Sequence, residues 1–149
     1  MLEYMQLALE LAREAAERGE VPVGAVVVRD DDGAVIGRGY NMREERQSPA
    51  AHAEMIAIED AAKTIGSWRL CGCTLYVTLE PCPMCMGAII NARIGKVVFG
   101  AFDKAAGCCG SVVNMAKLDF QSKPELLGGI MEDECAVMLG EFFRELRQN

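Results

Sequence analysis

The spacing of apolar and polar residues predicts helices and strands along most of the chain. Residues 1–18 place their apolar side chains on one face at helical spacing, and Gly19 follows as a natural stop. The predicted buried face consists of Leu2, Met5, Ala8, Leu9, Ala12 and Ala16. The chain is therefore expected to open with an amphipathic helix.

Two extended segments with a turn between them predict a β-hairpin over residues 23–40. Val23–Val28 is a short β-branched run, Asp30–Gly33 is rich in turn formers, and Ala34–Tyr40 resumes the extended pattern. The polar stretch Asn41–Ser48 then predicts a loop.

The central part of the chain predicts two more helices and two more strands. One helix runs to about Lys63 with Gly66 just beyond it, and its expected buried stripe is Met55, Ile58, Ala62 and Ile65. Thr74–Leu79 predicts a strand, and Pro83 suits the first position of a helix that should reach Gly95. The apolar and basic residues Met86, Ile89, Ile90 and Arg93 fall within that second helix.

The last third of the chain is less regular. The remaining expected elements are a strand at Lys96–Phe99, an irregular or partly helical segment at 103–123, a weak strand near 125–129 and an amphipathic helix at Glu132–Arg147. Strands that alternate with helices predict an α/β layered fold with a mixed sheet. At 149 residues the chain is expected to form a single domain, 1–149.

Composition narrows the class of protein. Half of the residues are apolar, but no run approaches the roughly 18 residues of a membrane span, so no membrane association is expected. Met1–Gln6 lacks a basic region like that of a signal peptide, and the protein is expected to be soluble and cytoplasmic. In a reducing compartment, seven cysteines favour metal binding, catalysis or core packing over disulfides.

Two short segments carry the candidate metal chemistry. His52 is the only histidine, and Cys82 and Cys85 are three residues apart at the start of a predicted helix. A catalytic Zn²⁺ typically has three protein ligands and one open position for water. The helix N-terminus favours the thiolates that Zn²⁺ requires. We therefore expect His52, Cys82 and Cys85 to bind one Zn²⁺.

Glu54 is the candidate catalytic residue. It lies two residues after His52, about 200° around an ideal helix, so it is not expected to ligate the same metal ion. It can instead act as a general base that deprotonates the water and then as an acid that delivers protons to a ring nitrogen and a leaving amine. His-x-Glu followed by Pro-Cys-x-x-Cys is the known signature of zinc deaminases.

A structural zinc site is the alternative interpretation of the same residues. Such a site needs four protein ligands, and Cys71 or Cys73 could supply the last one. The protein would then be a zinc-stabilised binding module. Cys108 and Cys109 raise the question of a second metal or redox role, but small-residue packing in a tight loop is the favoured interpretation.

On these motifs the chain resembles the bacterial tRNA-specific adenosine deaminases of the cytidine-deaminase-like superfamily. The resemblance covers nearly the full length, including Val21–Val26, Pro49–Glu54, Thr74–Cys82, Arg93–Ala101 and Asp133–Cys135. It implies a three-layer α/β/α fold with a five-stranded mixed sheet, a homodimer, and conversion of the wobble adenosine of a tRNA anticodon to inosine. Departures from the family pattern occur at 48–50, 104–109 and 121–123.

The resemblance also implies residue roles. Asn41 would contact the target base, the backbone of Ala53 would help to hold its ring, and Val23 would line the pocket. Possible RNA contacts are Arg43, Arg46, Lys104, Phe143, Arg144 and Arg147. Of the pair Phe142 and Phe143, one is expected to pack in the core and the other to support a flipped nucleotide.

The net charge of −7 bears on the substrate, because affinity for phosphate backbones comes mainly from Lys and Arg. An alternative substrate is therefore a free base or nucleoside, such as guanine, cytosine or a modified purine. An open cavity with basic residues at its mouth would favour RNA, and a sealed pocket would favour a small metabolite.

Overall fold

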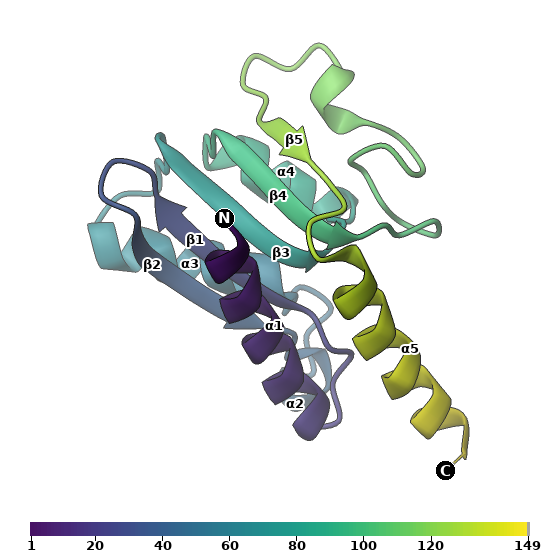
Figure 1. The fold of residues 1–149 in the computed structure, drawn as a ribbon. Coiled ribbons are helices and arrows are strands. Elements are labelled where there is room, and N and C mark those ends of the chain that lie inside the picture. The colour runs from purple at the N-terminus through teal and green to yellow at the C-terminus, as the bar shows by residue number, and fades with distance from the viewer. Residues whose placement is uncertain (149) are drawn as a thin grey trace.

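A computed structural model describes residues 1–148, which form one five-stranded sheet flanked by helices (Figure 1). The strand order is β2-β1-β3-β4-β5. The strands are β1 (Gly24–Arg29), β2 (Ala34–Tyr40), β3 (Cys73–Leu79), β4 (Lys96–Ala101) and β5 (Glu125–Leu127). β1 is antiparallel to β2 and β3, whereas β3, β4 and β5 run parallel. The mixed five-stranded sheet is therefore confirmed.

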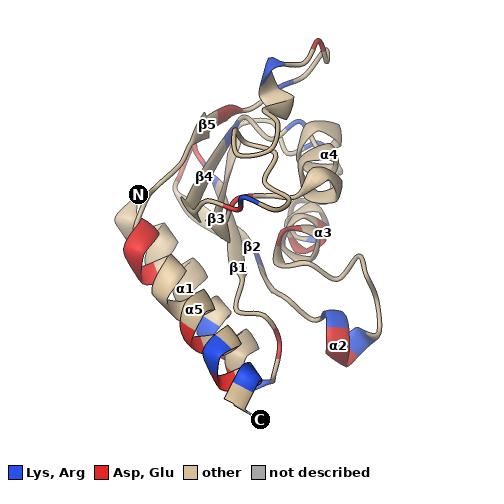
Figure 2. Cartoon of the chain, turned by 90° about the vertical axis from the view of Figure 1, so that its right-hand side faces the viewer, with Lys and Arg blue, Asp and Glu red and all other residues tan. Residues whose placement is uncertain are grey.

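The helices form a layer on each side of the sheet. They are α1 (Leu2–Glu17), α2 (Arg43–Arg46), α3 (Ala53–Ile65), α4 (Pro83–Asn91), the 3₁₀ turn η1 (Met115–Lys117) and α5 (Glu132–Gln148). Helices α1 and α5 cover one face, and α3 and α4 cover the other (Figure 2). This arrangement confirms the expected three-layer α/β/α fold; that residues 1–149 act as one domain stays a prediction.

Helix α1 has the predicted bounds but a slightly different buried face. Met5, Ala8, Leu9 and Ala12 are buried as expected. Leu2 is 63% exposed, and Ala15 rather than Ala16 completes the buried set. Leu2 therefore lies outside the buried face, although Met5 of the same turn is fully enclosed.

The predicted buried stripe of α3 is wrong. Met55, Ile58, Ala62 and Ile65 are only partly buried, and the fully enclosed positions are Ala53, Glu54, Ala57 and Ala61. The alanines lie against two glycines of β2, Gly37 and Gly39, so the helix backbone approaches the strand closely. The face of α3 that is buried is the one whose small side chains let the helix backbone approach β2, and not the one with the largest apolar side chains.

Two further boundaries differ from expectation. The predicted loop Asn41–Ser48 contains the short helix α2. Helix α4 ends at Asn91 instead of reaching Gly95, and Arg93 lies outside it with a φ of 66°. The chain turns there through this left-handed residue and then enters β4. The strand near 125–129 and the partly helical segment 103–123 are both confirmed, by β5 and η1.

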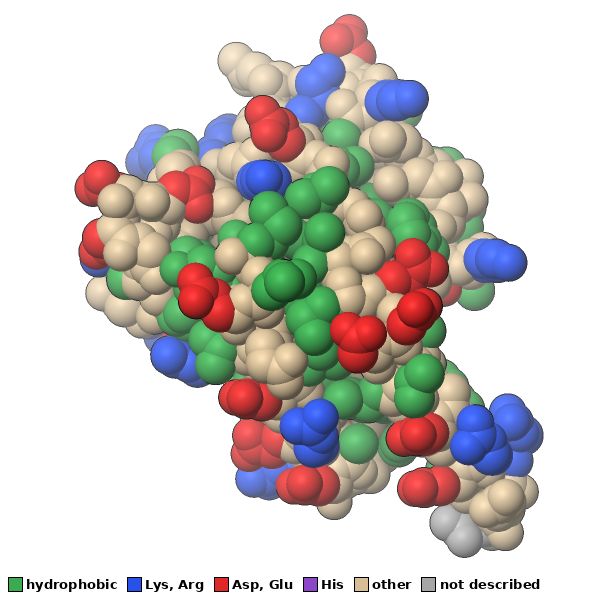
Figure 3. All heavy atoms as spheres, viewed as in Figure 1, with side chains coloured by type: hydrophobic (Ala, Val, Ile, Leu, Met, Phe, Trp, Pro, Cys, Tyr) green, Lys and Arg blue, Asp and Glu red, His purple; other side chains and the backbone are tan. Residues whose placement is uncertain are grey.

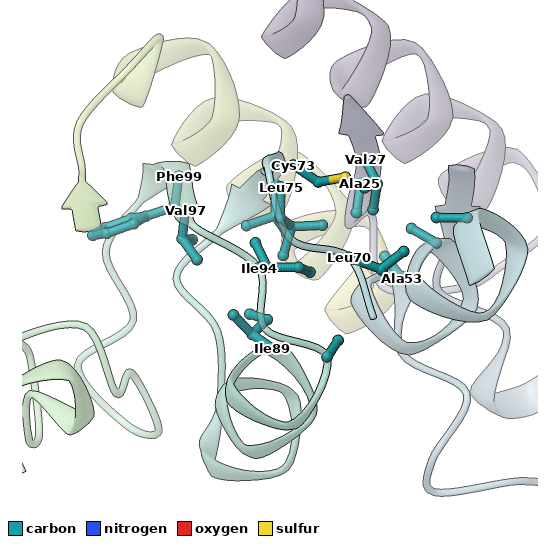
Figure 4. Packing of buried hydrophobic residues seen from close by; sticks show 14 of the residues in the cluster. Ala25, Val27, Ala53, Leu70, Cys73, Leu75, Ile89, Ile94, Val97 and Phe99 are labelled. Atoms are coloured by element: carbon teal, nitrogen blue, oxygen red, sulfur yellow. The ribbon is translucent and has the colours of Figure 1, made fainter. Parts of the chain in front are cut away.

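The core between the sheet and the α3–α4 layer is built from β-branched residues, leucines and alanines (Figure 4). Leu75 and Val97, on adjacent parallel strands, point into it together with Ile89 and Ile94 from the α4 region. β3 is buried along nearly its whole length. Its carboxyl end pairs with that of β4 through Leu79 and Ala101. The loops that follow these two strands therefore start side by side.

On the face formed by α1 and α5, hydrophobic side chains gather near the middle, and charged side chains of both signs surround them (Figure 3). The only histidine, His52, is not visible on this face. Within residues 1–148, no helix combines the length and the apolar character needed to cross a membrane.

Candidate metal centre

The starts of two helices supply the candidate metal ligands. His52 is the N-cap residue of α3, and Cys82 is the N-cap residue of α4. Neither side chain makes a capping hydrogen bond. Both are therefore free to point at a shared centre, and Cys85 joins them from the first turn of α4. The fold of α3 and α4 therefore brings the starts of two helices together at one site.

The ligand atoms have the separations that a tetrahedral Zn²⁺ requires. The His52 Nδ1 atom lies 3.6 Å from the Cys82 sulfur and 3.5 Å from the Cys85 sulfur. With Zn–N near 2.0 Å and Zn–S near 2.3 Å, tetrahedral geometry places nitrogen and sulfur about 3.5 Å apart. One imidazole and two thiols also form a donor set that Zn²⁺ favours. The residues present therefore fit a zinc ion.

The two thiols of the site have opposite proton affinities. Interaction with the neighbouring Cys85 thiol lowers the pKa of Cys82 to about 4, and His52 acts in the same direction. Hydrogen bonding to Cys82 and burial raise the pKa of Cys85. Cys82 is therefore the more acidic thiol of the pair.

Glu54 lies in the first turn of α3 and lines the same cavity as His52 and Cys82. It is one of the few buried charged residues, at 4% exposed. Burial raises the pKa of its carboxyl to about 7. A carboxyl with a pKa near neutrality can both accept and return a proton at physiological pH.

A cavity of about 500 Å³ surrounds these residues. Its polar side chains come from α3, from the ends of β2 and β3 and from the segment after β4. Exposed side chains also line it, among them Arg43, Phe102, Lys104 and Phe143. The cavity therefore reaches the surface, and two cations lie at its mouth.

The three predicted base-contacting residues all line this cavity. Asn41 is 5% exposed; its Nδ2 donates to the Val21 carbonyl at 3.2 Å, and its Oδ1 accepts from the Arg43 N–H at 3.1 Å. These bonds fix the amide orientation and leave one N–H and one lone pair for a ligand. Val23 adds an apolar wall, and Ala53 is the first residue of α3, whose N–H lacks an intrahelical acceptor.

The predicted RNA contacts divide into two groups. Arg43, Lys104 and Phe143 line the cavity. Arg46 lies in α2, and Arg144 and Arg147 lie on α5; all three are exposed but do not line the cavity. Phe143 is 41% exposed, and Phe142 is partly buried and packs edge-on against it.

Sequence reasoning missed two buried carboxylates beside the site. Glu20, 2% exposed, accepts the N–H groups of Glu44 at 3.0 Å and Glu45 at 2.8 Å, and so holds α2. Glu80, also 2% exposed, binds the segment that follows β4. A glutamate immediately before Pro-Cys-x-x-Cys, at the end of a buried strand, was the only signal in the sequence for the second.

The other cysteines do not complete a four-ligand site. Within residues 1–148, the only cluster with metal-ligand geometry is His52, Cys82 and Cys85. Cys71 and Cys73 lie at the opposite end of β3 from Cys82. Cys108 and Cys109 belong to the hydrophobic core cluster, and the Cys109 thiol lies 3.6 Å from the sulfur of Met86. The packing interpretation of these two cysteines is therefore confirmed.

Comparison with known proteins agrees with this site. Residues 1–101 match the family described as the cytidine and deoxycytidylate deaminase zinc-binding region. The tRNA-specific adenosine deaminase of Bacillus subtilis strain 168 is 51% identical over 146 residues, which cover 97% of this chain and 89% of that protein.

Two solved structures have the same fold. One, from work on A-to-I editing by tRNA:A34 deaminases at the wobble position of transfer RNA, has a TM-score of 0.87 and 42% identity, with 93% of this chain and 99% of that chain covered. A guanine deaminase from Nitrosomonas europaea has a TM-score of 0.77 and 25% identity, with 95% and 83% covered. The chain belongs to the cytidine and deoxycytidylate deaminase zinc-binding family.

Proposed function

We propose that this protein is a zinc-dependent hydrolase that converts adenosine to inosine at the wobble position of a tRNA anticodon. The observation that carries the proposal is a cavity that is lined by the candidate ligands His52 and Cys82 and opens at a surface mouth with Arg43 and Lys104. The 51% sequence identity to a tRNA-specific adenosine deaminase supports this choice of substrate.

In this mechanism His52, Cys82 and Cys85 would hold one Zn²⁺, which would lower the pKa of a water molecule and so supply a nucleophile at neutral pH. Glu54 moves the protons. Its carboxylate takes one proton from the water that attacks C6 of adenine and delivers it to the ring nitrogen N1. A second proton passes through the same carboxyl to the departing amino group, which leaves as ammonia while the C6 oxygen becomes the carbonyl of inosine.

Asn41, Val23 and Ala53 would hold the base during these steps. The fixed Asn41 amide offers one donor and one acceptor to the edge of the base, and Val23 forms an apolar wall. The free N–H of Ala53 can donate to a ring atom. A base must leave its stack to reach this cavity, and an anticodon loop permits that at lower cost than a duplex.

The surface mouth supports an RNA substrate in spite of the acidic net charge. Arg43 comes from α2 and Lys104 from the segment after β4, so the two cations lie on different walls of one cavity. These positions support contacts to phosphates on either side of a flipped nucleotide, and the exposed ring of Phe143 supports a stacking role. Arg46, Arg144 and Arg147 would contribute only to more distant contacts.

The substrate proposal is tested by comparing an anticodon stem-loop that contains adenosine at the wobble position with free adenosine, guanine and cytosine. Inosine formation in the stem-loop, with kcat/KM far above that of any free compound, is the expected result. Turnover of free bases or nucleosides alone would reject the tRNA assignment and favour the metabolite alternative that the guanine deaminase fold also allows.

We also propose that the active form is a homodimer and that residues 1–149 act as one domain. Four apolar residues of α3 remain partly exposed after the helix packs on the sheet, and they support a second copy of the chain as the partner of this helix: Met55, Ile58, Ala62 and Ile65. Sedimentation equilibrium should give the mass of two chains. A Met55→Glu variant should shift the mass toward one chain, and a monomeric wild-type protein would contradict the proposal.

A further inference from the structure

Glu80 is a buried carboxylate between the end of β3 and the first thiol ligand. Its backbone N–H donates to the Ala101 carbonyl at 2.9 Å, which ties the end of β3 to the end of β4. Its side chain contributes to the cavity wall, and both of its carboxylate oxygens accept hydrogen bonds from the segment Phe102–Ser111. Glu80 is therefore placed between the metal ligands and one wall of the cavity.

Four donors from this segment saturate the carboxylate. Oε1 accepts from the Asp103 N–H at 2.9 Å and from the Ser111 hydroxyl. Oε2 accepts from the Cys109 N–H at 2.9 Å and from the Ser111 N–H at 3.1 Å. Because Asp103 and Ser111 both bind the same carboxylate, the nine residues from 103 to 111 are closed into a loop. The four donors also stabilise the buried negative charge, which would be costly without them.

The packing of the loop shows that the carboxylate has a fixed place. A Cβ at Gly107 would lie 2.3 Å from the Glu80 Cδ and 2.5 Å from the Asp103 carbonyl oxygen. The Gly107 N–H donates to that carbonyl at 2.8 Å, and the Cys108 N–H donates to the Pro81 carbonyl at 2.9 Å. The loop therefore wraps closely around Glu80 and also contacts the residue before Cys82.

The same loop supplies one wall of the active-site cavity. Phe102, Asp103, Lys104 and Ala106 all line it. Asp103 itself accepts the N–H groups of Ala105 at 3.0 Å and Ala106 at 3.3 Å, so the turn that carries Lys104 is built on a residue that Glu80 anchors.

We propose that Glu80 is a positioning residue for substrate binding, which holds the 102–111 wall at a fixed distance from the metal centre. It acts through Asp103, Cys109 and Ser111 and does not touch the substrate. This inference rests on the proposed deaminase function. Loss of the carboxylate should free the wall and weaken substrate binding, while the ligands and Glu54 keep their places on α3 and α4.

The test is a Glu80→Gln variant, with a substitution of the exposed Glu125 of strand β5, Glu125→Gln, as the matched control. Glutamine has one acceptor oxygen and turns an NH₂ group toward N–H donors, so it loses about half of the bonds without a change in size. We expect one Zn²⁺ per chain, KM for the stem-loop raised about tenfold and kcat changed less than threefold. Hydrogen exchange at the amides of Asp103, Cys109 and Ser111 should become faster, and exchange in β3 should not.

Two further variants guard against a folding defect in the first. Ser111→Ala removes one side-chain donor and should raise KM about twofold to threefold. Gly107→Ala places a Cβ against the Glu80 carboxylate and should raise KM although residue 80 is still glutamate. The Glu125→Gln control should match the wild type in both constants.

A purely structural role predicts a different outcome. In that case kcat would fall in proportion to lost zinc or to the unfolded fraction, and KM would stay constant. That result, or unchanged KM and hydrogen exchange in Glu80→Gln, overturns the proposal. If the wild-type protein does not deaminate the stem-loop, the proposed function fails, and the exchange measurement still decides whether Glu80 anchors the wall.

Discussion

Gly37 in β2 lies so close to Ala57 in α3 that a Cβ at position 37 would come 2.3 Å from the Ala57 carbonyl oxygen. The same Cβ would meet the Ala61 side chain and N–H at 2.8 Å. These contacts hold α3, and therefore His52 and Glu54 at its start, directly on the sheet. The position of the site thus depends on the absence of a side chain at residue 37.

A Gly37→Ala variant should be destabilised because the helix must move away from the strand. We expect a loss of about 1–3 kcal/mol in the free energy of unfolding, the usual range for overpacked cores, measured by urea denaturation of the zinc-loaded protein. Gly140→Ala is the control. Gly140 lies in α5 with nothing within 4 Å of a Cβ added at that position, and alanine there should add about 0.5–1 kcal/mol. Equal stability of the two variants would contradict the close packing.

A Glu54→Gln variant should keep its zinc and lose its activity. Glutamine preserves the shape of the side chain but cannot accept a proton from water, so turnover should fall by about 10²–10⁴-fold. Inosine formation and zinc content, measured on the same sample, check the loss of turnover and the retention of the metal ion. Glu59→Gln, an exposed substitution on the same helix, should behave like the wild type. Full inosine formation in Glu54→Gln would remove Glu54 from the proton transfers, and no turnover in the wild type either would favour the binding-module alternative.

Zinc removal should change the number of reactive thiols. Cys71 is the one exposed cysteine, so the zinc-loaded protein should show one fast-reacting thiol with a disulfide reagent. Chelation frees Cys82, whose thiol is only partly buried and has a pKa of about 4, and should raise that number to two, because the fully buried Cys85 thiol keeps its proton. Cys109 should stay unreactive in both states, because burial raises the pKa of its thiol to about 12. A Cys71→Ser variant should show no fast thiol until the metal is removed, and an unchanged number after chelation would argue against thiol ligation.

A Lys104→Ala variant should bind RNA less well without losing the chemistry. If Lys104 neutralises one phosphate, its removal should reduce the slope of log affinity against log salt by about 0.7–0.9. The stem-loop KM should rise, and any residual turnover of free adenosine should not change. Lys63→Ala, at the far end of α3, is the matched control and should leave the slope as it is. An unaltered slope in Lys104→Ala would remove this residue from the RNA contacts.

The elements of the fold were predictable wherever the periodicity was strong. Helix α1, the β1–β2 hairpin, β3, β4 and α5 lie where the pattern of apolar residues placed them. The buried face of α3 was not predictable in this way, because small alanines against Gly37 and Gly39 replace the large side chains that a periodicity argument selects. Helix α2 was missed because its stability comes from Glu20, a residue more than twenty positions earlier in the chain.

The candidate metal centre was predictable because rare residue types stand at diagnostic spacing. A single histidine and one Cys-x-x-Cys pair left little choice of ligands, and the structure brings them together. The cavity wall was harder to foresee. Phe102 and Leu139 reach the cavity from segments far apart in sequence, and no local pattern distinguishes them from ordinary surface residues.

His52 and Cys82 stand at positions where serine, threonine, aspartate or asparagine would normally stabilise a helix, by about 1 kcal/mol each. Neither provides that stabilisation here, so selection for thermal tolerance alone would replace both of them. Engineering this protein for heat resistance by improving its helix N-caps would therefore favour substitutions at His52 and Cys82, the two residues that cannot be replaced without loss of the metal centre.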